Sequence, residues 1–315
     1  MKNTAKKLLA LAMGLILLAS CTSKENDDKD LTIGLIQLAD HPALDASREG
    51  FIERLDAENI SYKLIDQRAN GDLSLLAQFA SDLKNKNVDL VYAIGTPAAQ
   101  AVANTITDKP VLFAAVTDPK GAGLDKENVS GVSDYVEAGE LIDDLLKLYP
   151  ETKVIGTMYN TNEQNSKVQI GALEKALKER GLKLEKQGLT SINDIPQAIV
   201  SLKTKVDAVV TVTDNLVVNA MPVVSDNLNK EEIPSIAYDE GSVKNGALMS
   251  KGVNYKDLGK MAGDMAVNIL KEGKTPKDLP YQKAQKLKTL VNKKTAENLG
   301  LDLDSDVLKD AEIID

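Results

Sequence analysis

Runs of aliphatic residues alternate with amphipathic segments along this chain, and the alternation occurs twice. The first set of apolar runs covers 31–38, 62–66, 88–94 and 110–116, with helical segments near 43–58, 72–85 and 97–106. The second set covers 153–159, 182–188, 206–212 and 234–238, with helical segments near 165–180, 193–203 and 215–228. Apolar strands separated by amphipathic helices indicate βαβ units, in which helices cover both faces of a parallel sheet. The sequence therefore predicts an α/β fold with two doubly wound parallel-sheet lobes.

Short similarities between the two halves support an internal duplication. TIGLIQ from Thr32 aligns with VIGTMY from Val154, and GFIERL from Gly50 aligns with GALEKAL from Gly171. VDLVYAIGTPAAQAV, which begins at Val88, aligns with VDAVVTVTDNLVVNA in the second half. The alternative is a pair of unrelated βαβ units that share common strand residues. Because open α/β sheets bind ligands at the carboxyl ends of their strands, two such lobes predict a cleft lined by these loops.

The loops that follow the predicted strands are rich in hydroxyls, amides and carboxylates, which are groups that orient a small polar ligand. Three carboxylates on these loops, those of Asp118, Asp214 and Asp239, are candidates to neutralise a ligand ammonium, while helix N-terminal amides suit a carboxylate. A free α-amino acid carries both groups. The candidate ligand-binding residues are Gln37, Gly95, Thr96, Pro97, Thr117, Asp118, Tyr159, Asn165, Ser166, Asp214, Asn215, Tyr238 and Asp239.

Each of these residue types also has a purely structural explanation. Thr96 and Asp214 stand where helix N-caps stand, and Pro97 suits the first helical position. Asp118 and Asp239 are typical of turns. Tyrosines at strand ends can wall a side-chain pocket, but buried tyrosines with a satisfied hydroxyl are also common.

The N-terminus predicts export and a lipid anchor. Three lysines precede Leu8 to Ala19, an apolar or small run of 12 residues, whereas a membrane-spanning helix needs about 20. Residues 1–20 therefore match a lipoprotein signal peptide, and Leu18-Ala19-Ser20-Cys21 resembles a lipobox, which predicts lipidation at Cys21. Residues 21–30 would then form a polar tether. The alternative is an ordinary secretory signal with an incidental thiol.

Charge and composition exclude several other functions. Removing residues 1–20 takes away three lysines and no acid, which leaves 35 basic against 47 acidic side chains and a net charge of −12. Such a surface argues against binding to nucleic acid. With His41 as the only histidine and Cys21 as the only cysteine, the sequence predicts no metal site and no intrachain disulfide. GxSxG, P-loop and GxGxxG motifs are absent, so no catalytic residue and no cofactor are predicted.

Several separated motifs carry a resemblance to a known family. QLADHPALDASREGF, AIGTPAAQA, AAVTDPKGAGL, YNTNEQNS, the TDN loop and KNGALMSKGVNYKDLGKMA resemble the substrate-binding lipoproteins of ABC importers. These have a type I periplasmic-binding-protein fold, and the tryptophan/tyrosine-type branch is the most similar. The resemblance runs from about Leu31 to Val291.

The resemblance implies two lobes joined by three hinge crossings. The N-terminal lobe would contain residues 31–133 and 253–281, and the C-terminal lobe would contain 134–252 and 282–315. It also implies capture of a small zwitterionic ligand, an aromatic L-amino acid above all, with an ABC permease and its ATPase as partners. The protein would lie outside the cytoplasm and contact the membrane only through lipidated Cys21.

Three alternatives stay open at this stage. The first is a protein of the same fold that binds or senses a sugar or another polar solute. The second is a repressor-type sensor, which would need a DNA-binding headpiece where this chain has an export signal. The third is a surface enzyme whose site has no recognised motif.

Overall fold

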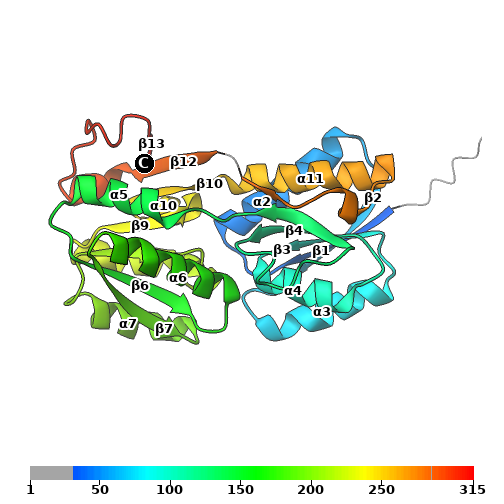
Figure 1. Ribbon diagram of the computed structural model, residues 1–315, viewed down its shortest axis with the longest axis horizontal. Helices are drawn as coiled ribbons and strands as arrows, with labels where there is room; N and C mark the ends of the chain where they lie inside the picture. The colour runs from blue at the N-terminus through cyan, green and yellow to red at the C-terminus, as the bar shows by residue number, and fades with distance from the viewer. Residues whose placement is uncertain (1–30, 285) are drawn as a thin grey trace, which may run out of the picture. The chain divides into compact units, whose positions relative to one another are not determined.

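The computed structural model describes residues 31–284 and 286–315, so the predicted signal peptide, Cys21 and the tether lie outside the described residues. Two separate β-sheets and the helices that cover them make up the described chain (Figure 1). None of the helices in this part of the chain has the length and apolarity that a membrane crossing requires. The predicted α/β class with two parallel-dominated sheets is confirmed.

The first sheet has six strands in the order β11-β5-β4-β3-β1-β2, all of them parallel. The central strands LVYAI and VLFAAV are buried along their whole length, as expected for strands covered on both faces. The strands are β1 (Leu31–Gln37), β2 (Tyr62–Arg68), β3 (Leu90–Ile94), β4 (Val111–Val116), β5 (Val129–Ser133) and β11 (Gln282–Lys283). The helices of this lobe are α2 (Pro42–Ala57), α3 (Leu73–Asn85), α4 (Thr96–Thr105) and α11 (Tyr255–Glu272), with the short η2 (Pro276–Asp278).

The second sheet has seven strands in the order β13-β12-β10-β9-β8-β6-β7, parallel except for the β10–β12 pair. The strands are β6 (Val154–Asn160), β7 (Lys183–Leu189), β8 (Ala208–Thr211), β9 (Ser235–Asp239), β10 (Met249–Val253), β12 (Leu287–Asn292) and β13 (Glu312–Ile314). The helices are α5 (Ala138–Leu148), α6 (Gln164–Glu179), η1 (Ile192–Asp194), α7 (Ile195–Leu202), α8 (Asn215–Asn219), α9 (Met221–Lys230), α10 (Glu240–Lys244) and α12 (Lys293–Asn298). The helix expected over 215–228 is thus two helices, and α9 begins with Pro222 in its first turn, where proline cannot supply a helical N–H.

The chain passes between the two sheets three times: after β5, after β10, and between β11 and β12. Two of these crossings differ slightly from the expected boundaries. Val253 still pairs with Leu287 in the second sheet, and Lys283 still pairs with Ser133 in the first. The crossings therefore come one and two residues later than the sequence places them.

Helix α11 packs directly on α2 and so returns to the first lobe (Figure 1). An ideal Cβ on Gly50 would lie 2.0 Å from the Lys256 carbonyl oxygen, and one on Gly259 would lie 1.9 Å from the Ser47 carbonyl oxygen. Only glycine allows two backbones to approach this closely. Gly171, which aligns with Gly50 in the internal repeat, has open space around the same position.

Candidate functional site

A small cavity between the two lobes, called the inner cavity here, collects polar side chains from both sheets. Its volume is about 10 Å³, which is room for about one water molecule. The carboxyl end of β4, the starts of α2 and α6 and the loops after β8 and β9 all reach it. It is lined by His41, Ala43, Leu44, Ala115, Thr117, Asp134, Asn165, Thr213, Asn215, Val218, Asp239 and Tyr255.

Two buried carboxyl groups stand in the inner cavity. Asp134 accepts hydrogen bonds from the Thr117 hydroxyl at 3.0 Å and from the Tyr255 hydroxyl at 2.9 Å. Asp239 caps α10 and accepts from the backbone N–H and the hydroxyl of Ser242, at 2.8 and 2.6 Å. Burial raises the pKa of Asp134. No lysine or arginine within 31–284 and 286–315 forms an ion pair with either acid, so the cavity favours a cation.

The inner cavity also contains two polar side-chain atoms that have no hydrogen-bond partner among the described residues. The Nδ1 atom of His41 and the Oδ1 atom of Asn165 are both buried and make no hydrogen bond there. The Nε2 atom of His41 lies 3.2 Å from Asn215 Oδ1, and because an amide oxygen only accepts, Nε2 carries the proton. Burial lowers the pKa of His41, which leaves Nδ1 of the neutral ring as an acceptor. Both unpartnered atoms therefore accept hydrogen bonds.

The start of α2 supplies the complementary donors. Helix α2 is 16 residues long, begins after His41, and has no side-chain cap. The first N–H groups of an α-helix have no acceptor within the helix, and Pro42 has no N–H to offer. The backbone N–H groups of Ala43 and Leu44, which line the inner cavity, are therefore available to an anion and benefit from the helix dipole.

Backbone strain also marks the inner cavity. Ala115 has a φ of 57°, a left-handed conformation that alanine adopts only at a cost of about 1 kcal/mol or more. The pairing of β4 with β5 shifts register at this point, between Phe113 and Val116. Such irregularities are found at strand ends that shape binding sites.

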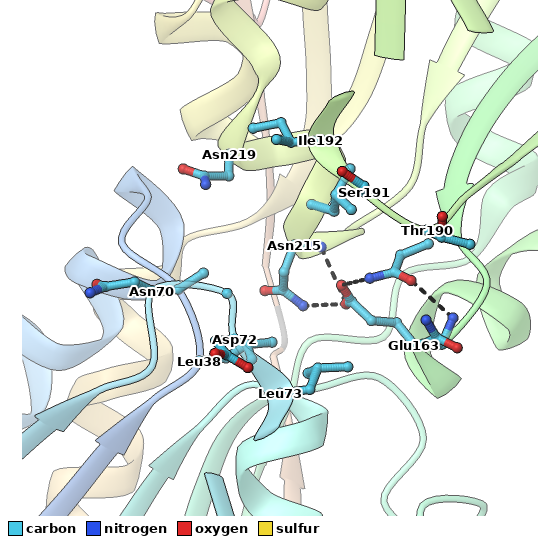
Figure 2. Close-up of a pocket in the computed structure, with 15 residues that line it drawn as sticks. Leu38, Asn70, Asp72, Leu73, Glu163, Thr190, Ser191, Ile192, Asn215 and Asn219 are labelled. Carbon is cyan, nitrogen blue, oxygen red and sulfur yellow. Dashed lines mark hydrogen bonds between the residues drawn. The ribbon is translucent and has the colours of Figure 1, made fainter. Parts of the chain in front are cut away.

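A second and larger cavity, called the outer cavity here, lies beside the inner one and shares Asn215 with it. Its volume is about 410 Å³. Figure 2 shows the residues that line it, with the segment 70–73 facing Glu163 and the segment 190–192. The lining residues are Leu38, Ala39, Asn70, Gly71, Asp72, Leu73, Asn160, Asn162, Glu163, Thr190, Ser191, Ile192, Asn215, Leu216 and Asn219.

Glu163 is the buried acid of the outer cavity. Its Oε2 atom accepts from the backbone N–H and side-chain amide of Asn215 and from Asn165 Nδ2 at 3.1 Å (Figure 2). Its Oε1 atom accepts from Asn160 Nδ2 at 3.3 Å. Burial and the nearby charge of Asp214 raise the pKa of Glu163 to about 7. Through Asn215, Glu163 is linked to His41 on the other lobe.

The structure brings some predicted site residues together and not others. Thr117, Asn165, Asn215 and Asp239 line the inner cavity. The remaining predicted residues line neither the inner nor the outer cavity. These are Gln37, Gly95, Thr96, Pro97, Asp118, Tyr159, Ser166, Asp214 and Tyr238.

Asp214 is the clearest departure from the sequence-based expectation. One of its carboxylate oxygens caps α8 by accepting from Val217 N at 3.0 Å. The other accepts from the Ser166 hydroxyl at 2.6 Å and from Asn160 N at 2.5 Å. Protein donors thus reach both oxygens, and Asp214 lines neither cavity, which favours the capping role over contact with a ligand ammonium.

Other predicted residues also serve the local structure. Asp118 accepts from Gly121 N at 2.9 Å and closes a turn. The Gln37 side chain donates to Ala39 O and Asp45 Oδ1, at 2.9 and 2.7 Å, and so holds the segment that leads to α2. Gly95 has a φ of 95° at the start of α4, a conformation that favours glycine.

Several cavity residues have little or no signal in the sequence. Asp134 and Tyr255 lie at hinge crossings, where no strand-to-helix loop pattern marks them. His41 follows the first strand in a loop that predicts a cleft position, but the sequence does not mark it as a ligand contact. The described residues contain no group of three or more histidine, cysteine, aspartate or glutamate side chains that could hold a metal. Glu163 belongs to the polar run YNTNEQNS, and its position before α6 was the available signal.

Comparison with known proteins agrees with this architecture. Residues 32–314 match the family model described as ABC transporter substrate binding protein. The tyrosine-binding protein of Clostridioides difficile is 37% identical, over 94% of this chain and 93% of that protein. A crystal structure from Streptococcus pneumoniae, described as the ABC domain in complex with L-Trp, is 34% identical over 90% of this chain and 100% of that one, with a TM-score of 0.85.

A third comparison bears on conformation. The ligand-free, open structure of a Clostridium difficile substrate-binding protein with adhesive properties is 38% identical, over 90% of this chain and 99% of that one, with a TM-score of 0.69. The described conformation thus superposes better on the L-Trp complex, although that sequence is less similar.

Substrate-binding proteins of ABC importers work outside the cytoplasm, bind a small molecule and deliver it to a membrane transporter. The tryptophan/tyrosine-type resemblance of the sequence and the type I periplasmic-binding-protein fold are both confirmed. The family match covers nearly the whole described chain, and the two sheets and the similar relatives agree with it. This chain therefore belongs to the family of ABC transporter substrate-binding proteins.

Proposed function

We propose that this protein captures an aromatic L-amino acid in the cleft between its lobes and presents it to an ABC permease. The observation that carries the proposal is the pair of buried acids, Asp134 and Asp239, which form no ion pair with a basic side chain of the described residues. A ligand ammonium would supply the missing charge. One relative is named a tyrosine-binding protein and another was crystallised with L-Trp, which supports an aromatic side chain on the ligand.

The two ends of an amino acid match different parts of the inner cavity. Asp134, Asp239, His41 Nδ1 and Asn165 Oδ1 are all acceptors, and an ammonium group has three donors. The carboxylate would lie at the free N–H groups at the start of α2. A sugar has no charge for the two acids, so the zwitterion is the better match.

Binding would require the lobes to move apart. A cavity of about 10 Å³ does not admit an amino acid, so the ligand would enter an open form and be enclosed as the lobes close. Closure would exclude water and strengthen the pairing of the ammonium with the two acids.

Calorimetry tests the ligand directly. We expect tyrosine or tryptophan to bind with micromolar or tighter affinity, about 8 kcal/mol or more. Asp239→Asn keeps an oxygen for the α10 cap but removes the charge, so we expect affinity to fall by about 30-fold or more. The matched control is Asp118→Asn, which changes a turn outside both cavities. Binding of a sugar in place of every aromatic amino acid would contradict the proposal.

We propose that no reaction accompanies binding. The family is one of binding proteins, and the proposal implies that the ligand is recovered unchanged. Mass spectrometry of the compound released by denaturation checks this, and a product that accumulates with time would favour the enzyme alternative.

We propose further that Cys21 carries the membrane anchor. The apolar run before it and the polar residues after it support this assignment. Cys21→Ala expressed in the native host should lose fatty-acid label and membrane association, while Thr22→Ala should keep both. Equal labelling of the Cys21→Ala protein and its parent would leave the ordinary secretory signal as the better explanation.

A further inference from the structure

The outer cavity offers room that the inner cavity lacks. The inner cavity holds about 10 Å³, whereas the outer cavity holds about 410 Å³, within the range of sites that bind small molecules. Asn215 lines both, so the two are adjacent. If the ammonium and carboxylate occupy the inner cavity, as the proposed function requires, the outer cavity is the space that can take the rest of the ligand.

We propose that the outer cavity receives the aromatic side chain and that Glu163 selects a ring with a hydrogen-bond donor, a phenol or an indole N–H, over a plain phenyl ring. This proposal rests on the proposed function and names its ligand more narrowly. Apolar side chains of Leu38, Leu73 and Leu216 provide surfaces for the ring.

The hydrogen bonds of Glu163 leave one oxygen available. Three N–H groups, two from Asn215 and one from Asn165, already point to Oε2. The Oε1 atom receives a single long bond of 3.3 Å from Asn160, although a carboxylate oxygen can accept two. A phenol or indole donor at Oε1 would complete the set. Above its raised pKa of about 7 the Glu163 carboxylate is ionised, and Oε1 can then only accept hydrogen bonds.

The same feature disfavours other side chains. A phenyl ring would cover Oε1 without offering it a second donor, and a carboxylate oxygen that loses contact with water without gaining a hydrogen bond costs more than a lost contact. A carboxylate side chain would meet two acids, Asp72 and Glu163, on the cavity wall. The site therefore suits a neutral aromatic ring with a polar edge.

Glu163→Gln tests the selection sharply, because the amide has one acceptor and one donor. The three donors at Oε2 require the amide oxygen there, which places the NH₂ group at the Oε1 position. The amide N–H of Glu163→Gln would then face the phenol O–H or indole N–H of the ligand, and two donors cannot form a hydrogen bond. The ligand series is tyrosine, tryptophan, phenylalanine and O-methyltyrosine, of which the last keeps the ring and the oxygen but lacks the O–H. Calorimetry gives the affinity of each.

For the parent protein we expect tyrosine to bind at least about tenfold more tightly than phenylalanine and O-methyltyrosine. In Glu163→Gln this ratio should fall to about threefold or less, while the affinity for phenylalanine changes little. Glu174→Gln, the same substitution at an exposed site on α6, should keep the parent ratio.

Two results would overturn the selection by Glu163. One is a parent protein that binds phenylalanine, O-methyltyrosine and tyrosine equally. The other is a Glu163→Gln protein that loses affinity for all ligands by the same factor, which is the effect of a merely structural residue. If Glu163→Gln does not fold, the comparison of tyrosine with O-methyltyrosine in the parent decides alone. Binding of none of these compounds would instead refute the proposed function itself.

Discussion

His41 and Asn215 form a hydrogen bond of 3.2 Å from one lobe to the other, although 174 residues separate them in the chain. His41 precedes α2 and Asn215 begins α8, so the bond joins the helix starts that face each other across the cleft. A contact of this kind exists only while the lobes are close together. It therefore contributes to the closed form and not to the open one.

We expect His41→Ala to release its ligand faster. The substitution removes two buried hydrogen bonds, the one to Asn215 and the one that Nδ1 would accept from the ligand, each worth about 1 kcal/mol, which together correspond to about a 30-fold higher dissociation rate, while the association rate changes little. Stopped-flow fluorescence or surface plasmon resonance measures both rates. Asn227→Ala, at a partly exposed position on α9 away from both cavities, is the control. An unchanged dissociation rate would show that closure does not depend on this bond.

The stability of the protein should depend on pH through Glu163. Its pKa in the folded state is raised from the ordinary 4.5 to about 7, so the folded protein favours the protonated carboxyl. This contribution is complete below about pH 4.5 and is lost as the pH rises through about 7. The free energy of unfolding of the parent, relative to Glu163→Gln, should therefore fall by about 2–3 kcal/mol between pH 4.5 and 8. Urea unfolding at several pH values measures it.

Two features make this pH experiment specific. Asp134 also has a raised pKa, but it is present in both proteins and cancels in the difference. Glu297→Gln, at an exposed position on α12, should show the pH dependence of the parent. A parent and a Glu163→Gln protein with parallel pH profiles would mean that folding does not shift the pKa of Glu163.

The two glycines that align in the internal repeat should respond to alanine in opposite directions. Gly50→Ala places a methyl group 2.0 Å from the Lys256 carbonyl oxygen, so α2 and α11 must separate and stability should fall by about 3 kcal/mol or more. Gly171→Ala fills open space inside α6 and should raise stability by about 0.5–1 kcal/mol. Thermal or urea unfolding compares them. A stable Gly50→Ala protein would contradict the close helix crossing.

Asp214→Ala should lower stability rather than ligand affinity. The substitution leaves three donors, Val217 N, Asn160 N and the Ser166 hydroxyl, without their acceptor. We expect a loss of about 2–4 kcal/mol in the free energy of unfolding, with ligand affinity within about threefold of the parent under conditions where the protein stays folded. Calorimetry and urea unfolding on one preparation separate the two effects. A large loss of affinity with normal stability would show that Asp214 contacts the ligand.

The sequence predicts the helices and strands well where one periodicity dominates. VLFAAV and LVYAI are apolar throughout, and the structure has a buried strand at each. VSGVS, which forms β5, escaped prediction because its small polar residues resemble a loop, yet all five are buried between β4 and β11. Strand β10 likewise contains a serine, a lysine and a glycine. Neighbours that are distant in sequence give these segments their structure.

The candidate site was partly predictable for a similar reason. Loops after strands are visible in the sequence and predict Thr117, Asn165, Asn215 and Asp239 as candidates, and the structure places these four on the inner cavity. The choice between a cap and a ligand contact depends on whether the carboxylate also faces the cavity, and the sequence does not contain that information. Asp214 and Asp239 both cap helices, and protein donors reach both oxygens of each, but only Asp239 lines the inner cavity. Asp134 has no local signal, because its environment is made by Thr117 and Tyr255.

The return of α11 and β11 to the first sheet has a consequence for how the chain is made. During synthesis and export the first lobe emerges before the second, but it lacks α11 until residue 272 and β11 until residue 283. Until then the face of α2 that carries Gly50 has no partner helix. The N-terminal lobe therefore stays incompletely packed until the central part of the C-terminal lobe has emerged. A chain truncated before α11 would have neither lobe complete.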